Sequence, residues 1–594
     1  MSSYAAPLKD MRFAIVELAG LAEVTALPGC EEVNAELVDA VLGEAAKFAR
    51  EVLDPLNREG DKAGATLADG VVTAPEGFKD AYRRFIEAGW NGLGGHTEYG
   101  GQGLPHLVAT PVQEIWKSAN MALCLAPMLT AGVLEALKAH GSPAQLATYA
   151  GKLTSGVWTG TMNLTEPQAG SDLSAVRTRA VREGDHYRIQ GTKIFITWGE
   201  HDLAENIVHL VLARTPDAPE GVKGISLFIV PKFLPRSDGG IGERNDIRCV
   251  SLEHKLGIHA SPTCVLAYGD NGGAVGTLVG EENRGLEYMF TMMNHARLAV
   301  GVEGVAVGER AYQHALEYAR TRVQGREIGQ RGGDRVTIIH HPDVRRMLMS
   351  MRAQTEAMRA LAYYAAAALD RSKRHPDPAE RRRAQGLLDL LTPVVKGWCT
   401  EQGVEVASTG IQVHGGMGFV EETGAAQYLR DARITTIYEG TTGIQASDLV
   451  GRKVAMEKGA TATAVVGAMR GLEPRLAAAG ETYLRDGLKE AVDGLESATR
   501  WIVDTWAQSP KAVAGVSVPY LKLFGTVAGG WMMARAALVA QERIREPDAD
   551  RGFLEGKLAS ARFYVEHELP RAIPLAREVT RGADSVLALD PSKF

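Results

Sequence analysis

The chain has 594 residues, far more than one hydrophobic core can organise, so about three to five domains or subdomains are expected. Its 45% hydrophobic and 23% charged residues are typical of a globular protein. The net charge of −7 gives no support for nucleic-acid binding.

The five cysteines are scattered and form no Cys-x-x-Cys pair, which argues against a disulfide framework and a zinc site. The segment Met1–Asp10 lacks the basic and apolar parts of a signal peptide. No uninterrupted apolar run reaches the roughly 18 residues of a membrane span. The best candidate, Phe524–Ala540, contains Arg535 and several glycines, and is typical of a buried bundle helix. We therefore expect a cytoplasmic protein in a reducing compartment.

Residues 1–157 are predicted to form a helical domain. Apolar side chains recur there at helical spacing, for example Val38, Val41 and Leu42. The exception is residues 92–105, where many glycines and a proline predict an irregular loop.

Between residues 158 and 285 the pattern changes to alternation. Residues 186–189, 207–212 and 225–229 are predicted strands, separated by glycine, proline and aspartate turns. A β-barrel or sandwich is expected in this region.

Helices return over residues 286–452. A sustained apolar stripe predicts a long bundle helix over Val344–Ala365. The polar stretch Arg371–Arg383 contains two prolines and is predicted to be a solvent-exposed loop. Residues 453–594 are rich in Ala, Glu, Arg and Leu at helical spacing, which predicts an additional helical domain without a chemical motif.

Several common sites are not supported by the sequence. No Gly-x-Gly-x-x-Gly follows a strand, so a Rossmann nicotinamide site is not predicted. There is no phosphate loop, His-Glu-x-x-His or Gly-x-Ser-x-Gly motif. The adjacent His340 and His341 would point in different directions on a regular element, so no metal site is predicted there.

One carboxylate stands out, because Glu439 lies between Tyr438 and Gly440, just before Thr441 and Thr442. Its apolar neighbours in sequence would remove water, which disfavours the charged carboxylate and raises its pKa toward the range of a general base. The glycine would let the backbone approach a flat ligand, and the threonines can bind polar edges of that ligand.

Four other stretches carry groups suited to a polar aromatic ring and a pyrophosphate. The first two offer hydroxyls, amides and aromatic rings, and Arg322 in the third can pair bidentately with a phosphate. The third follows a helix that carries Asn294 and Arg297. The four stretches are Met162–Asp172, Gly191–Gly199, Arg322–Arg326 and Gln412–Gly418.

In this order, these stretches resemble the motifs of acyl-CoA dehydrogenases, and the resemblance covers about residues 40–450. Residues 165–172 match the family signature Thr-Glu-Pro-x-Ala-Gly-Ser-Asp. The resemblance implies an α+β, mainly α fold with a helical N-terminal domain (1–157), a central β-barrel (158–285), a helical bundle carrying the base (286–452) and an additional C-terminal helical domain (453–594). The length is similar to that of a long subclass that includes 3-methylmercaptopropionyl-CoA dehydrogenases.

The resemblance also implies FAD as the cofactor, Glu439 as the catalytic base and no metal. The implied FAD contacts are Met162, Leu164, Thr165, Gly170, Ser171, Phe195, Thr197, Arg322, Gln324, Gln412, Gly415, Gly416, Thr441 and Gly443. The implied substrate contacts are Ser171, Asn294, Arg297, Tyr438 and Gly440. In relatives, the arginine and Gly-Gly motifs reach the flavin nucleotide of a neighbouring subunit.

The sequence departs from the family pattern at a few positions. Phe195 stands where tryptophan is common, and Trp198 where asparagine is common. Gly325-Arg326 replaces the usual Phe-Gly, and Asn294 replaces a frequent acid. Some members carry their base near the position of Arg297, but the residues there include no acid, which leaves Glu439 as the candidate.

The implied reaction is α,β-dehydrogenation of an acyl-CoA to the trans-2-enoyl-CoA, with Glu439 taking the α-proton and the flavin taking a hydride. An electron-transfer flavoprotein would accept the electrons. Short, medium, long and sulfur-containing acyl chains, including 3-methylthiopropionyl-CoA, all remain open.

Two other functional classes are alternatives, and the first of them would share most of these motifs. An acyl-CoA oxidase would react fast with oxygen, and a non-catalytic scaffold would be expected to have lost Glu439 or the flavin motifs. A homodimer is expected if the extra helical domain occupies the position of a second dimer in tetrameric relatives; a tetramer is the alternative. Membrane-surface association through that domain is a further alternative.

Overall fold

The computed structural model describes residues 4–329 and 332–594, so the first three residues of the N-terminal segment lie outside it. The chain forms two compact units. Unit 1 comprises Met1–Ala46, Pro105–Ser118 and Val300–Phe594, and unit 2 comprises Lys47–Leu104 and Ala119–Ala299. Each unit is described by itself.

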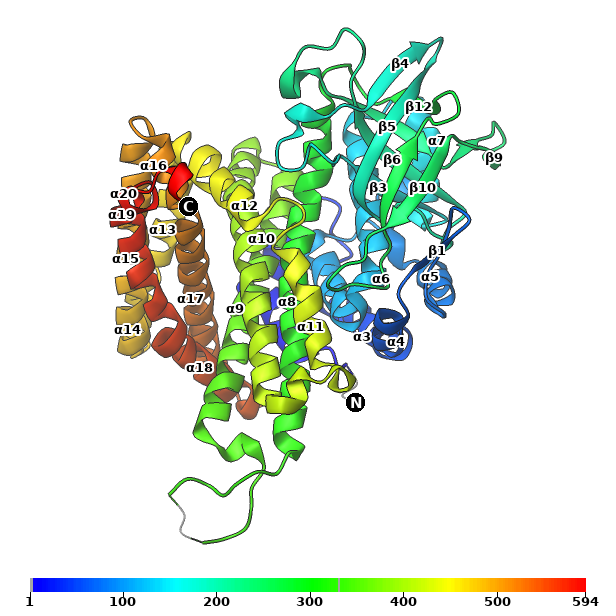
Figure 1. Ribbon diagram of the computed structural model, residues 1–594. Coiled ribbons are helices and arrows are strands. Elements are labelled where there is room, and N and C mark those ends of the chain that lie inside the picture. The colour runs from blue at the N-terminus through cyan, green and yellow to red at the C-terminus, as the bar shows by residue number, and fades with distance from the viewer. Residues whose placement is uncertain (1–3, 330–331) are drawn as a thin grey trace. The chain divides into compact units, whose positions relative to one another are not determined.

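Unit 2 combines helices with one large sheet (Figure 1). Its helices are η2 (Ala49–Leu53), α4 (Asp54–Ala63), α5 (Phe78–Glu87), η3 (Trp90–Gly92), η4 (Thr97–Tyr99), most of α6 (His106–His140) and α7 (Pro143–Ser155). Helix α6 is interrupted at Asn120, whose backbone leaves the helical region and whose side-chain oxygen accepts from the N–H of Leu123. The expected irregular loop after Gly92 is confirmed, apart from the short η4 turn.

The sheet of unit 2 has the strand order β10-β11-β5-β12-β7-β6-β3, with β4 also paired to β5. Strand β3 runs parallel to β6, whereas the other pairs in this sheet are antiparallel. The strands are β3 (Trp158–Asn163), β4 (Arg179–Glu183), β5 (His186–Thr197), β6 (Asn206–Ala213), β7 (Ser226–Pro231), β10 (Ile247–Leu252), β11 (Thr263–Tyr268) and β12 (Ala274–Leu278). Two small hairpins pair β1 (Thr66–Ala68) with β2 (Val71–Thr73) and β8 (Phe233–Pro235) with β9 (Ile241–Arg244).

The three strands predicted from alternation are confirmed, because they lie within β5, β6 and, apart from its first residue, β7. Every residue of β6 and β7 is buried, which explains their nearly continuous apolar runs. The long strand β5 pairs with β12 through residues 187–189 and with β11 through residues 191–197. Strand β5 therefore joins the β10-β11 pair to the remaining strands of the sheet.

Unit 1 is helical, and its long helices lie side by side (Figure 1). Helix α8 (Gly285–Thr321) enters it at residue 300 and is followed by η7 (Ile338–His340), α9 (Pro342–Arg374), α10 (Pro378–His414), η8 (Gly415–Phe419), η9 (Glu421–Thr423), α11 (Ala425–Thr435), α12 (Thr442–Asp448) and η10 (Leu449–Ala455). The N-terminal helices are α1 (Leu8–Phe13), η1 (Ala14–Leu18), α2 (Leu21–Thr25) and α3 (Ala35–Phe48). The predicted helix over Val344–Ala365 is confirmed as part of α9.

The predicted solvent loop over Arg371–Arg383 is wrong in extent. Helix α9 continues to Arg374 and α10 begins at Pro378, which leaves only residues 375–377 between them. Proline is compatible with the first turn of a helix, and the Asp377 side chain caps α10 by accepting from the N–H of Ala379. The prolines mark a helix boundary, and the charged residues lie on helical turns.

The C-terminal part of unit 1 confirms the additional helical region. Its elements are α13 (Ala460–Arg470), α14 (Glu473–Ala478), α15 (Thr482–Trp506), α16 (Pro510–Gly515), α17 (Ser517–Arg543), α18 (Arg551–Phe563), η11 (Tyr564–Glu568), η12 (Leu569–Arg571), α19 (Ala572–Arg581), α20 (Ala583–Val586) and η13 (Pro591–Lys593). Helix α17 contains the segment predicted to be a buried bundle helix. Helices α6 and α17 are long and apolar enough to cross a membrane, yet 89% of the most apolar window of each is buried inside the protein. This burial is characteristic of core helices.

A buried ionic cluster in unit 1 is centred on Arg359 of α9, which is 1% exposed. The guanidinium donates to Glu114 of α6 at 2.6 and 2.9 Å and to Glu309 of α8 at 2.7 Å, and it also pairs with Asp10 of α1. The Tyr363 hydroxyl donates to the second oxygen of Glu114 at 2.6 Å. One side chain therefore joins four helices that are distant in sequence.

Replacing Arg359 with methionine should strongly destabilise unit 1. The substitution leaves buried carboxylates without their cation, a change that typically costs about 3–5 kcal/mol. Urea unfolding should therefore shift to a lower midpoint for Arg359→Met. Arg83→Met, which removes an ion pair between exposed side chains, is the control and should unfold nearly as the parent does. An unchanged midpoint for Arg359→Met would show that the cluster is not important for stability.

Candidate active site

The candidate site residues fall into two groups, one in each unit. Unit 2 holds the signature loop after β3, the aromatic end of β5 and the first part of α8. Unit 1 holds the Glu439 loop, the Arg322 segment and the Gly-Gly turn.

The signature loop of unit 2 is anchored by the buried ion pair of Glu166 and Lys193. The Lys193 ammonium donates to a Glu166 carboxylate oxygen at 2.8 Å and to the Leu164 carbonyl at 3.0 Å. The Ile194 N–H donates to the Thr165 carbonyl at 2.9 Å. These bonds fix the backbone of Leu164 and Thr165 beside strand β5.

The protonation of this pair follows from its surroundings. Burial lowers the pKa of Lys193 to about 8, and the Glu166 carboxylate opposes that shift. Burial by itself would raise the pKa of Glu166, but Lys193 and the hydrogen bonds from Thr178 and the Arg177 N–H hold it below its usual value. Glu166 is therefore a charged carboxylate at neutral pH, and Lys193, Thr178 and the Arg177 N–H donate hydrogen bonds to it.

The two aromatic departures at the end of β5 have opposite environments. Phe195 is 58% exposed, whereas Trp198 is 1% exposed and its indole N–H donates to the Ala122 carbonyl at 3.0 Å. Both residues have a positive φ, 59° for Phe195 and 51° for Trp198, which is rare for bulky side chains and is the kind of strain that gathers at functional sites. Phe195 can offer its ring to a flat ligand, and Trp198 belongs to the core.

The remaining unit 2 candidates are placed around these anchors. Gly170 and Ser171 are exposed on the loop, while Met162 in β3 and Thr197 at the end of β5 are partly buried. On α8, Arg297 is 4% exposed and donates to the Asn294 side-chain oxygen at 3.4 Å. The structure thus brings Asn294 and Arg297 together, as their spacing on one helix requires.

In unit 1, Glu439 lies in a tight loop between α11 and α12. Its backbone has a φ of 56°, and Gly440 follows with a φ of 86°. A Cβ at Gly440 would lie 2.8 Å from the Gln445 amide nitrogen, so glycine is required there for space as well as conformation. The neighbour that requires glycine here is Gln445 of the same chain, and the approach of a ligand to Gly440 stays a prediction.

Two hydrogen bonds hold this loop from fully buried side chains. Lys396 of α10 donates to the Gly440 carbonyl at 2.7 Å, and Gln445 of α12 donates to the Glu439 carbonyl at 2.9 Å. Both side chains are fully buried. The Thr442 hydroxyl donates to Glu401 of α10 at 2.6 Å. Thr441 caps α12 by accepting from the Ile444 N–H at 3.2 Å, and Gly443 lies in the first turn.

Tyr438 is anchored at its hydroxyl, which donates to the buried carboxylate of Glu303 on α8. That carboxylate also pairs with Lys117 at 3.2 Å. Burial, followed by the Glu303 charge, raises the pKa of Tyr438 well above its usual value, so the phenol stays protonated. Tyr438 is therefore fixed by Glu303, which is itself held by the ion pair with Lys117 of α6.

The two predicted phosphate-binding segments are exposed. Arg322 and Gln324 lie on a short segment that pairs with the backbone at Val336, since the Gln324 N–H donates to the Val336 carbonyl at 3.0 Å. Gln412 is exposed near the end of α10, and a Cβ at Gly415 or Gly416 would meet no described atom within 4 Å. The ends of α8 and α10 are adjacent, since the Tyr318 and His414 rings lie 4.5 Å apart.

Comparison with known proteins identifies this arrangement. Family models for the N-terminal, middle and C-terminal domains of acyl-CoA dehydrogenases match residues 36–157, 161–270 and 283–454, and an acetyl-CoA dehydrogenase C-terminal-like model matches 460–590. The chain belongs to the acyl-CoA dehydrogenase family. It is an oxidoreductase of the FAD-dependent class, and the predicted α+β, mainly α fold is confirmed.

Two curated relatives match over nearly their whole length. The 3-methylmercaptopropionyl-CoA dehydrogenase of Ruegeria pomeroyi is 50% identical over 98% of this chain and 99% of its own. The broad-specificity linear acyl-CoA dehydrogenase FadE5 of Mycobacterium tuberculosis is 35% identical over the full length of both. These matches place the chain in the long subclass.

Solved structures support the fold. ACDH-11 of Caenorhabditis elegans in complex with C11-CoA matches with a TM-score of 0.76 at 22% identity, covering 96% of this chain and 92% of that one. An acyl-CoA dehydrogenase from Bacillus anthracis complexed with FAD has a TM-score of 0.73 at 20% identity, covering 97% and 93%.

The residues present fit FAD. An exposed aromatic ring at Phe195 suits a flat ring system, and the open backbone of Gly415 and Gly416 with the exposed Arg322 suits a dinucleotide. When bound, FAD supplies the acceptor for a hydride. The chain supplies the base, the positioning groups and the contacts to the acyl-CoA.

Several supporting residues were not predicted. Lys193 and Glu166 lie inside recognised motifs, so their spacing could have suggested the pair. Lys396 and Glu303 have no local signal, because each acts on a loop that is distant in sequence. Their roles emerge only from the packed structure.

Replacing Lys193 with methionine should loosen the signature loop. The substitution removes the cation from the buried Glu166 carboxylate, so the backbone at Leu164 and Thr165 loses its anchor. We expect a lower ratio of flavin to protein absorbance and a lower thermal midpoint. The control is Lys223→Met, at an exposed lysine of the same unit, which should retain both values. Full flavin content in Lys193→Met would contradict this role.

Proposed function

We propose that Glu439 is the base that removes the α-proton of an acyl-CoA, and that 3-methylmercaptopropionyl-CoA is the preferred substrate. The choice of base rests on the strained, doubly anchored loop that presents Glu439 next to Tyr438. The choice of substrate rests on the 50% identity to the Ruegeria enzyme over nearly the whole chain, compared with 35% to FadE5.

In this reaction the position of the base matters as much as its basicity. The α-proton of a thioester is weakly acidic, so a carboxylate must be held within hydrogen-bond reach of it and kept from competing contacts. The buried donors Gln445 and Lys396 fix the carbonyls of Glu439 and Gly440, respectively. The hydride leaves the β-carbon for the bound cofactor, and an electron-transfer flavoprotein is the proposed final acceptor.

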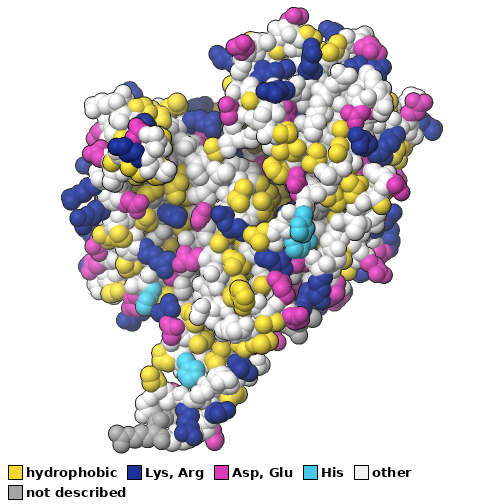
Figure 2. Space-filling view, viewed as in Figure 1, with side chains coloured by type: hydrophobic (Ala, Val, Ile, Leu, Met, Phe, Trp, Pro, Cys, Tyr) yellow, Lys and Arg dark blue, Asp and Glu magenta, His cyan; other side chains and the backbone are white. Residues whose placement is uncertain are grey.

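We also propose that the active form is a homodimer in the cytoplasm. Large apolar side chains are exposed between residues 322 and 329 and around the Gly-Gly turn. In Figure 2, hydrophobic side chains are visible at the base of the projection that contains residues 322–329. Their exposed fractions are 78% for Ile328, 88% for Phe419 and 47% for Met417. Such surface is usually covered by a partner. A reducing location agrees with five described cysteines that are buried and form no disulfide.

The Glu439→Gln variant should retain FAD and lose dehydrogenation. Loss of a general base typically lowers turnover by about 10²–10⁴-fold. The measurement is an anaerobic titration with acyl-CoAs, including 3-methylmercaptopropionyl-, butyryl-, octanoyl- and palmitoyl-CoA, that follows the visible flavin absorbance. Glu422→Gln, at an exposed glutamate of a nearby turn, should bleach as the parent does.

The same titration separates the alternatives. Near-normal bleaching of Glu439→Gln would refute the base, and preferred bleaching of the parent by a long acyl chain would refute the substrate. Turnover with oxygen that matches turnover with an artificial acceptor would instead indicate an oxidase.

The proposed dimer is tested by light scattering. The parent should have the mass of a dimer, and Phe419→Asp should shift the protein toward monomer because a charge replaces an apolar contact. Phe594→Asp is the matched control, since Phe594 is 91% exposed at the far end of the chain. A tetrameric parent would overturn the proposed dimer, and an unchanged mass for Phe419→Asp would exclude this surface.

A further inference from the structure

Glu303 is a buried carboxylate with no contact assigned above to FAD or acyl-CoA, yet it binds the residue next to the proposed base. It lies on α8 and is 0% exposed. Burying a carboxylate is unfavourable unless a cation and hydrogen-bond donors compensate it. Lys117 of α6, which is 3% exposed, supplies the cation at 3.2 Å, and the Tyr438 hydroxyl supplies a donor. The ion pair therefore fixes a hydrogen-bond acceptor in the interior of unit 1, and Tyr438 uses it.

Tyr438 is held at its backbone and at the far end of its side chain. Its N–H donates to the Ile434 carbonyl at 3.1 Å, just beyond α11, and its hydroxyl donates to Glu303. Tyr438 is partly exposed, whereas Glu303 is fully buried, so the phenol ring extends from the loop into the interior. A side chain that is fixed at both ends gives the loop a precise attachment point.

This attachment constrains the strained torsion of Glu439. The φ of 56° is the rotation about the N–Cα bond of Glu439, which follows directly on the peptide that joins it to Tyr438. A left-handed glutamate is unfavourable and persists only where its surroundings over-determine it. The bonds from Lys396 and Gln445 act after this torsion, on carbonyls of the loop. Glu303 acts before it, through Tyr438, so the torsion is held from both sides.

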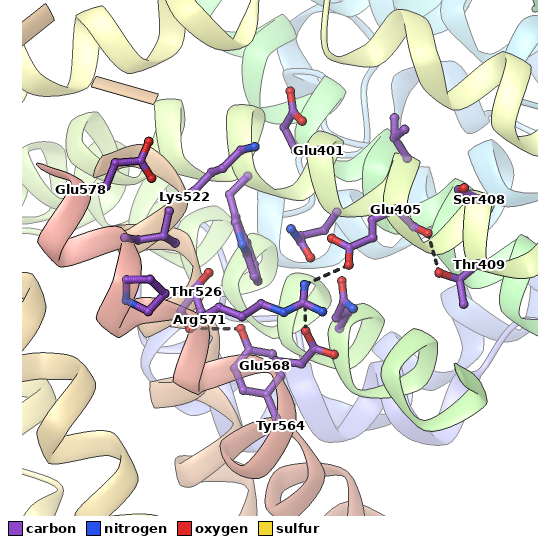
Figure 3. Close-up of a pocket in the computed structure, with 16 residues that line it drawn as sticks. Glu401, Glu405, Ser408, Thr409, Lys522, Thr526, Tyr564, Glu568, Arg571 and Glu578 are labelled. Atoms are coloured by element: carbon purple, nitrogen blue, oxygen red, sulfur yellow. Dashed lines mark hydrogen bonds and ion pairs between the residues drawn. The ribbon is translucent and has the colours of Figure 1, made fainter. Parts of the chain in front are cut away.

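A second carboxylate also holds the loop, but from a different environment. Glu401 of α10 accepts from the Thr442 hydroxyl at 2.6 Å, is partly exposed and borders a cavity of about 670 Å³, as Figure 3 shows. Water can take the place of a hydrogen bond at such a cavity wall. Glu303 is fully buried instead, and a hydrogen bond in the interior is electrostatically stronger than one beside water. Tyr438 is thus the firmer of these two side-chain anchors.

We propose that Glu303 is a positioning residue for the dehydrogenation. Through the Tyr438 hydroxyl it holds the N-terminal side of the Glu439 loop, which keeps the base within reach of an α-proton. Lys117 contributes by compensating the charge of Glu303. The loop needs a hydrogen-bond acceptor at position 303, whereas the ion pair only makes a charged acceptor stable there. This inference rests on the proposed role of Glu439 as the base.

Tyr438→Phe tests the hydrogen bond alone, because it keeps the ring and leaves the ion pair intact. A displacement of about 1 Å can cost about 10²-fold in rate, so the limiting rate of anaerobic flavin bleaching should fall roughly 10–100-fold. The acyl-CoA concentration at half the limiting rate should change less than about threefold, since substrate binding is not altered. The acyl-CoA is the one of the four named above that bleaches the parent fastest. Tyr483→Phe, at a tyrosine of α15 that is 54% exposed, is the matched control and should bleach as the parent does.

An isotope effect identifies the step that becomes slow. The same acyl-CoA, deuterated at both α positions, reports how far removal of the α-proton limits bleaching. A misplaced base slows this step, so Tyr438→Phe should show an α-deuterium isotope effect at least as large as that of the parent. A smaller effect would show that another step had become limiting, and would overturn the positioning role.

Two double variants separate positioning from stability. Glu303→Leu with Lys117→Met removes the acceptor together with the ion pair, and replacing a buried ion pair by apolar side chains is often nearly neutral for stability. It should lose as much rate as Tyr438→Phe, and adding Tyr438→Phe to it should lower the rate no further. Glu303→Gln with Lys117→Met keeps an acceptor for the hydroxyl and should recover most of the rate. The thermal midpoint and flavin content of each variant show that the protein is folded and loaded.

The results distinguish this inference from the assignment of the base. Parent-like bleaching by Tyr438→Phe, or equal loss in both double variants, would overturn the role of Glu303 even where Glu439→Gln is inactive. Parent-like bleaching by Glu439→Gln would instead refute the base. If Glu303→Leu with Lys117→Met does not fold, Tyr438→Phe decides by itself, because it leaves the ion pair in place.

Discussion

The Glu439 loop is anchored by a buried cation, because the Lys396 ammonium donates to the Gly440 carbonyl next to the Gln445 bond to the Glu439 carbonyl. A left-handed backbone at a glutamate is unfavourable, and such a conformation persists only where its surroundings over-determine it. A fully buried lysine is itself costly unless it is well partnered. The two requirements are met together, because the carbonyl that the strained loop exposes is an acceptor that the buried cation needs.

Helix α10 organises most of unit 1 around this contact. Lys396 and Glu401 hold the two sides of the Glu439 loop, and Gln412 and the Gly-Gly turn at its end supply the predicted dinucleotide contacts. Pro393 lies one turn before Lys396, where it removes a backbone donor and favours a local bend. The helix can hold the loop because α9, α11, α12 and α17 pack against it. One helix thus connects the Glu439 loop, the Gly-Gly turn and the C-terminal helices.

The sequence predicts local patterns better than distant partners. Short stretches of sequence are enough to single out Glu439, the signature loop and the helical or alternating spacing of apolar residues. The structure confirms that spacing in β5, β6 and α9. The sequence predicts a long loop after Arg371 because proline breaks a helix when it lies in the helix interior. Pro378 instead lies at the first position of α10, where proline is compatible with the helix. Arg359 was not singled out, since its importance comes from three carboxylates that the fold brings to it from α1, α6 and α8.

The same physical reason separates the two aromatic departures at the end of β5. Both residues carry a ring, and the sequence predicts Phe195 as the contact with a flat ligand. Both also have a positive φ in the folded chain, but the larger residue fills the core and satisfies its indole N–H, whereas the smaller one stays exposed. Burial thus decides which ring is available, and burial is set by strands that pair across the sheet. For this reason a motif identifies the region of a site, whereas the packing around it determines which residues act there.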